Sequence, residues 1–149
     1  MNNNFTKKYQ HLTHDDTKFS ISSAIMFIIE TNHELYIFTE EDFELAVLFI
    51  VEAWNLAIIN DDEIISILIK KDAKRLKKVA NKPQKQIEAM LMSLIKMKKV
   101  LYGDVYRIIG DYEATFKNDE PYLKIASGKD MPADYFANYY REILFNNKK

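Results

Sequence analysis

The segment from Phe43 to Ile58 constrains the fold most, because it is apolar on nearly every side of a helix. The Thr39 hydroxyl can accept a first-turn N–H, and the acidic run Glu40–Asp42 follows against the positive end of the helix dipole. A helix that is apolar all round is covered by neighbouring elements or by a second copy of the chain. We therefore expect a central helix over residues 39–59, or a homodimer that forms through it.

Helical periodicity also governs the chain on both sides of this segment. Apolar spacings of three and four predict a first helix over residues 20–31, and the run Leu35–Phe38 is an edge strand or the entry to the next helix. The run Asn60–Asp62 ends the central helix and offers an N-cap for a further one, and residues 81–83 predict a turn, because Asn tolerates turn geometry and Pro suits a first helical turn. Helical spacing beyond that turn predicts another helix with the apolar positions Ile87, Met90, Leu91, Leu94 and Met97.

Strand-like runs replace the helical pattern after Lys99. Val100–Tyr102 and Val105–Ile109, joined by Gly103 and Asp104, predict a tight hairpin. Two further runs predict strands over 112–117 and 122–126, and residues 134–145 predict a C-terminal helix. The sequence therefore predicts an α+β fold: a mostly helical N-terminal part, a helix-turn-helix, an antiparallel β-hairpin or meander, and a C-terminal helix.

Several classes of protein are disfavoured. The chain has no cysteine, which excludes disulfides and thiolate chemistry and fits a reducing compartment. Its longest apolar runs are far below the roughly 18 residues that a membrane span needs, and its first residues lack the apolar core of a secretory signal. We expect a cytoplasmic protein that does not enter the membrane.

Catalytic chemistry finds little support in the sequence. No Gly-rich phosphate loop and no Gly-x-Ser-x-Gly motif occurs. The segment His11–Asp16 has a metal-like spacing, but we favour a polar lead-in over a metal site. Glu52, inside the apolar segment, reaches the surface, pairs with Arg107 or Arg141, or marks a functional pocket, and we favour the first two alternatives. We expect no enzyme, no catalytic residue, no cofactor and no metal.

Charge is sorted along this chain. From Glu30 to Glu63 there are ten acids and no Lys or Arg, whereas from Lys70 to Lys99 eleven bases oppose only Asp72 and a single glutamate. The formal net charge of −1 hides this separation. A basic tract on two consecutive helices is a candidate polyanion-binding surface, although charge runs are also often only the solvated side of helices.

The basic tract coincides with a helix-turn-helix pattern followed by the predicted hairpin at Gly103. The residues that carry this pattern are Leu76, Val79, Ala80 and Asn81, then Ile87, Leu91 and Leu94, then Val100 and Leu101. Over residues 62–109 the chain resembles the winged helix-turn-helix domains of DNA-binding regulators. The length of 149 residues is that of one ordinary domain, so we expect a single domain over 1–149, with a helical core (18–60), a winged-helix-like unit (61–109), and a meander with a C-terminal helix (110–146).

The resemblance implies a duplex DNA interface, as in a transcriptional, replication or partition regulator. A helix in the major groove carries short polar side chains that contact base edges and flanking cations that contact phosphates. The implied base-edge residues are Gln84, Lys85, Gln86 and Ser93, with Ala89 or Met92 against a thymine methyl. The implied phosphate contacts are Lys74, Arg75, Lys78, Lys82 and Lys96, with Arg107 as a further candidate.

A second function class remains open. The acidic half and the aromatic C-terminal segment, residues 135–145, could form the surface of a protein-interaction module, such as an inhibitor or immunity-type protein. Helix-start electrostatics account for most of the acids, and aromatics at helical spacing are typical of a core. Duplex DNA is therefore the partner that we expect, and a protein partner is the alternative.

Overall fold

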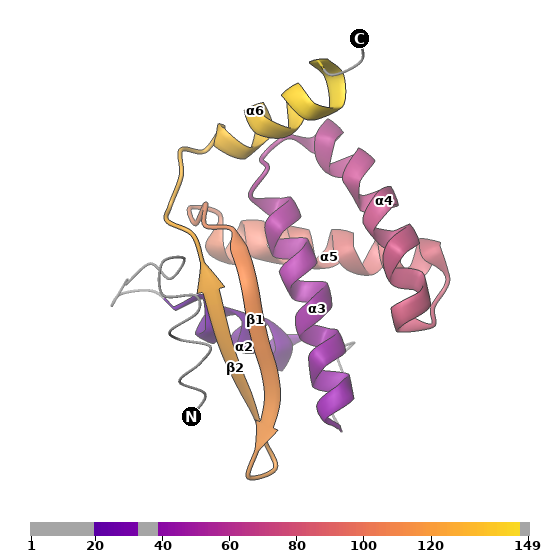
Figure 1. Cartoon of the computed structure of the whole chain (residues 1–149), viewed down its shortest axis with the longest axis vertical. Coiled ribbons are helices and arrows are strands. Elements are labelled where there is room, and N and C mark those ends of the chain that lie inside the picture. The colour runs from indigo at the N-terminus through magenta and orange to yellow at the C-terminus, as the bar shows by residue number, and fades with distance from the viewer. Residues whose placement is uncertain (1–19, 33–38, 147–149) are drawn as a thin grey trace. The chain divides into compact units, whose positions relative to one another are not determined.

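The computed structural model describes residues 20–32 and 39–146 (Figure 1). Within these residues the fold is α+β, as predicted: helices come first, a two-stranded antiparallel hairpin follows, and a C-terminal helix closes the chain. The elements are α2 Ile21–Thr31, α3 Glu40–Ala57, α4 Asp62–Ala80, α5 Gln84–Tyr102, β1 Ile109–Lys117, β2 Glu120–Ser127, α6 Tyr135–Arg141 and a π-helix, η1, Glu142–Asn146. The predictions for Leu35–Phe38 and for the histidine cluster lie outside the described residues.

The chain divides into two compact units, and α3 contributes to both. The first unit comprises residues 1–51 and 107–129, and the second comprises residues 52–106 and 130–149. Phe43, Val47 and Trp54 of α3 are fully buried, so the chain itself covers this apolar helix, which was the first of the two predicted alternatives. A homodimer through residues 39–59 stays a prediction.

In the first unit, local chemistry fixes where the helices begin. The apolar stripe of α2 is buried as its spacing predicts, and Ser20 caps the helix by accepting the Ser23 N–H. At the start of α3, the Asp42 N–H donates to Thr39 Oγ1 and the Thr39 N–H donates to Asp42 Oδ2, both at 3.1 Å. This reciprocal pair satisfies two N–H groups at the helix end.

The hairpin of the first unit turns at Asn118 and Asp119. Both residues have positive φ, 53° and 64°, which is the backbone of a two-residue hairpin turn with the twist of its strands. Lys117 pairs with Glu120 directly beside the turn, and the register continues to a bulge between Ile109 and Asp111. The strands predicted at 112–117 and 122–126 are therefore confirmed and lie within β1 and β2.

The hairpin predicted around Gly103 is wrong, because α5 continues through Tyr102 and residues 105–108 form no strand. Gly103 has φ −63°, so it does not supply the positive φ that a two-residue hairpin loop needs. A Cβ at this position would lie 2.5 Å from the Lys99 carbonyl oxygen, which explains a glycine by close backbone approach. The one hairpin of the described chain lies later, between β1 and β2.

In the second unit, α4 and α5 are joined by the short predicted turn, and α5 leaves it at a steep angle to α4 (Figure 1). Asp61 caps α4 by accepting the N–H groups of Glu63 and Ile64, as predicted. Asn81 ends α4 in the left-handed region, with φ 53° and ψ 48°. The helices bury one stripe each, formed by Ile64, Ile65, Ile69, Ala73, Leu76 and Ala80 of α4 and by Ile87, Leu91, Leu94 and Ile95 of α5. Val79, predicted to anchor α4, is instead 64% exposed.

Candidate nucleic-acid interface

The exposed side of α4 is cationic along its second half. Its five lysines are all exposed, whereas Ala73 and Leu76 on the same helix are buried. We name this set, Lys70, Lys71, Lys74, Lys77 and Lys78, the cationic face of α4. The predicted phosphate contacts Lys74 and Lys78 both belong to it.

The cationic face is not neutralised by the described carboxylates. Within the described ranges, no ion pair involves any of its five ammonium groups. Among the described carboxylates, those that form ion pairs with the basic tract are Glu52 and Asp72, which contact Arg75, and Asp62, which contacts Lys99. Arg75, although predicted to contact phosphate, is therefore held by carboxylates of its own chain.

The exposed side of α5 carries a mixed set of small, polar and cationic side chains. Lys85, Gln86, Ser93 and Lys96 are exposed, and so are Ala89 and Met92, which were predicted to touch a thymine methyl. Gln84 is partly buried, and its amide donates to Glu88 Oε2 at 3.3 Å. Lys82, in the turn, is half-buried. Most of the predicted base-edge residues thus lie on one side of a single helix.

The first turn of α5 contains no acidic residue, although the Glu88 carboxylate of the next turn accepts a hydrogen bond from Gln84. Pro83 is the N-cap of α5 and offers no side-chain acceptor. The first N–H groups of a helix carry partial positive charge. This turn therefore adds to the positive potential of Lys82 and Lys85.

Arg107 is not part of this surface. It belongs to the first unit and is 4% exposed. Its Nε donates to the Gly128 carbonyl at 3.2 Å, and its Nη2 donates to Ser127 Oγ at 2.7 Å. The wrongly predicted hairpin explains this correction, because Arg107 was expected beside a turn that does not form.

Lys98 belongs to the basic tract, but its side chain is buried. It is 2% exposed, its Nζ donates to the Val105 carbonyl at 2.6 Å, and the ammonium lies 4.9 Å from the centre of the Trp54 ring. Burial lowers the pKa of Lys98 to about 8, against the opposing attraction of Asp130 and Asp104. Helical spacing alone assigns a lysine to solvent, so the burial of Lys98 was not predictable from the sequence.

Arg75 is part of a partly buried cluster that sequence reasoning also missed. Its Nη2 lies 2.9 Å from Glu52 Oε1 and 3.6 Å from Asp72 Oδ1. Burial and the neighbouring Glu52 raise the pKa of Asp72 to about 6. Glu52 pairs with a base, which was one of the alternatives expected, and that base is Arg75 rather than Arg107 or Arg141. Arg141 instead contacts Asp61 at 2.6 Å.

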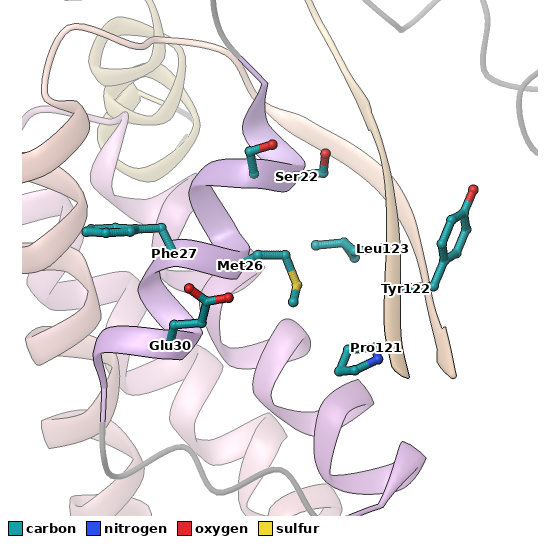
Figure 2. A pocket seen from close by; sticks show the side chains of 8 residues that line it. Ser22, Met26, Phe27, Glu30, Pro121, Tyr122 and Leu123 are labelled. Atoms are coloured by element: carbon teal, nitrogen blue, oxygen red, sulfur yellow. The ribbon is translucent and has the colours of Figure 1, made fainter. Parts of the chain in front are cut away.

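The first unit contains a pocket of about 380 Å³ between α2 and β2 (Figure 2). Met26 and Leu123 point toward one another across it, and Glu30 is its one charged side chain. The other lining residues are Ser22, Ser23, Phe27, Pro121 and Tyr122. This mostly apolar lining carries no buried polar group that would select a ligand, so the pocket is not the candidate site.

Comparison of the chain with protein-family models, with curated proteins and with solved structures found no match. None of the helices in the described part of the chain combines the length and apolar composition that a membrane crossing requires. Among the same residues, no group of three or more His, Cys, Asp or Glu side chains is placed to hold a metal ion. The geometry of α4 and α5 is therefore the basis for a functional proposal.

Proposed function

We propose that this protein binds duplex DNA through α4, the turn at residues 81–83, and α5. The observation that carries the proposal is the cationic face of α4, whose five lysines are exposed and unpaired with any described carboxylate. Phosphate contacts by lysine release condensed counterions and supply most of the affinity of non-specific DNA binding. The role that this proposal favours is that of a cytoplasmic regulator of transcription, replication or partition.

The exposed side of α5 supports a duplex rather than a small anion as the ligand. Gln86, Ser93 and Lys96 are donors of the kind that contact base edges and phosphates in a groove, and Ala89 and Met92 are apolar groups that fit a thymine methyl. A short helix pair joined by a tight turn is also the element that places such side chains in the major groove.

Single charge reversals test the proposal. Lys74→Glu and Lys78→Glu each remove one phosphate contact and add a repulsive carboxylate, so each should weaken binding to a random duplex about three- to ten-fold at moderate salt. Lys129→Glu is the matched control, because Lys129 is exposed, lies in the first unit and changes the net charge equally.

The control variant should bind within about two-fold of the unchanged protein. Equal weakening by all three substitutions would mean that only net charge matters, and no weakening by Lys74→Glu or Lys78→Glu would contradict the proposed surface. Fluorescence anisotropy with a labelled duplex measures these affinities directly.

A protein-interaction module is the second candidate, and one observation favours it. Four large side chains of the C-terminal segment are exposed, namely Tyr135, Tyr139, Ile143 and Phe145. Clustered exposed aromatics are typical of protein-binding surfaces. Stoichiometric association with a single protein, together with no affinity for duplex DNA, would favour this candidate over the first.

A further inference from the structure

We propose that the carboxyl pair of Glu52 and Asp72 regulates the DNA-binding surface by taking up one proton as the pH falls from 8 to 5. The inference rests on the proposed function and adds a pH dependence to the same surface. Uptake of the proton removes one negative charge from α4, the helix that carries the cationic face.

The geometry places the pair beside the cationic face and not at a distance. The Asp72 carboxylate lies 3.6 Å from Arg75, which is four positions after Lys71 and three before Lys78 and so neighbours both lysines on the helix surface. Glu52, from the C-terminal part of α3, approaches the same guanidinium to 2.9 Å. The side chains of Glu52 and Asp72 are each less than a quarter exposed, so solvent screens their mutual repulsion only in part.

Among the described residues, the groups that act on the Asp72 carboxyl either raise or lower its pKa. Burial raises its pKa most, the charge of Glu52 and a hydrogen bond with Glu52 raise it further, and Arg75 on the same helix lowers it, giving a pKa of about 6. From α6, Tyr140 also faces the pair, because burial, Tyr139, Asp72 and Glu52 all raise the pKa of its hydroxyl. Tyr140 therefore stays neutral in this pH range, and the proton binds to the carboxyl pair.

Protonation changes the local charge in the direction that favours a polyanion. Above pH 6 the cluster of Glu52, Asp72 and Arg75 carries a net charge of about −1, and below it about zero. A charge removed some 8 Å from a phosphate changes affinity about two- to five-fold at low salt. By linkage, DNA binding should in turn favour the protonated pair.

Asp72→Asn tests this regulation, because the Asn amide carries no charge and can donate to Glu52 as the protonated carboxyl does. At pH 8 and low salt the variant should bind a random duplex about two- to five-fold more tightly than the unchanged protein, and at pH 5 the two affinities should converge. The three histidines of the chain are present in both proteins, so the comparison removes their contribution.

Asp134→Asn is the matched control. Asp134 is exposed, its side chain makes no cap hydrogen bond, and the substitution changes the net charge by the same amount. Its ratio of affinity to the unchanged protein should stay the same at pH 8 and pH 5. Carboxyl NMR of the free protein supplies an independent readout, with an expected midpoint near pH 6 for Asp72.

The outcomes separate the regulation from the function. A midpoint near pH 4 for Asp72, or equal affinities of the unchanged protein and Asp72→Asn at pH 8, would overturn the regulation and leave DNA binding in place. Absence of duplex binding at every pH and salt concentration would overturn the proposed function and, with it, this regulatory role. The NMR midpoint would still show whether the pair binds a proton near pH 6.

Discussion

The ammonium group of Lys98 lies over the Trp54 ring and 5.7 Å from the centre of the Tyr106 ring, while its proton is donated to the Val105 carbonyl. Aromatic faces attract a cation, but the loss of water around a buried amine outweighs them, which lowers its pKa to about 8. At the residue scale, this group therefore fixes the segment after α5 and makes the stability of the protein depend on pH.

The sign of this dependence follows from the lowered pKa of Lys98. Below pH 8 the amine is charged in the folded and unfolded chain alike, and burying that charge reduces the free energy of unfolding. As the pH rises from 8 toward 10.5, the folded chain releases its proton first, so the free energy of unfolding rises. Relative to Lys98→Met, the unchanged protein should gain about 1–3 kcal/mol between pH 7 and pH 10.5.

Urea unfolding of both proteins at each pH measures this gain, and the comparison removes the contribution of other groups that titrate near pH 10. A difference between the two proteins that stays constant over this range would contradict the account of Lys98. Helical spacing did not predict the burial of Lys98, because its partners come from α3 and from the segment beyond α5.

At the element scale, the turn between α4 and α5 depends on the left-handed conformation of Asn81. Its N–H donates to the Lys77 carbonyl, which ends α4 and directs the chain toward α5. This conformation costs a Cβ-bearing residue other than Asn or Asp about 1–2 kcal/mol, whereas it costs Gly almost nothing. Asn81→Ala should therefore lower the free energy of unfolding by about 1 kcal/mol, and Asn81→Gly should leave it unchanged or raise it slightly.

Chemical denaturation of the two Asn81 variants checks this prediction. Equal stability of Asn81→Ala and Asn81→Gly would show that the turn does not need the left-handed backbone. Because the turn sets the direction of α5, Asn81→Ala should also weaken DNA binding, and Asn81→Gly should not.

Helix starts and turns were predictable from the sequence where residues close together in the chain determine them. Thr39 and Asp61 begin helices, and Asn118 with Asp119 forms a hairpin turn, because each signal depends on neighbours within a few residues. The run after Lys99 was misassigned, because Val100 and Tyr102 favour strands by type and yet end α5, with Val100 83% exposed. Short apolar runs do not separate a helix end from a strand.

The candidate site was predictable in part for the same reason. Helical spacing placed Lys74, Lys78 and Lys96 on the exposed sides of α4 and α5. Spacing indicates the contact of Arg75 with Asp72, three positions earlier, but it gave no information on the contacts Arg75–Glu52 and Arg107–Ser127, whose partners lie 20 or more positions apart in the sequence. Long-range pairing decides which bases of a basic tract remain open to a ligand.

At the scale of the whole molecule, the two units differ in charge. The described residues of the first unit include nine acids and four bases, whereas those of the second unit include ten acids and twelve bases. A polyanion is therefore attracted to the second unit and repelled by the first. The formal net charge of −1 does not describe either unit.

The salt dependence of duplex binding tests the central claim, that the cationic face of α4 binds phosphates, most directly. We predict that the logarithm of the association constant falls with the logarithm of salt concentration with a slope of about −3 or steeper, since each lysine–phosphate contact contributes about −0.9. The double variant Lys74→Glu/Lys78→Glu should reduce the magnitude of that slope by about 2. A slope near zero for the unchanged protein, or an identical slope for the double variant, would contradict the account.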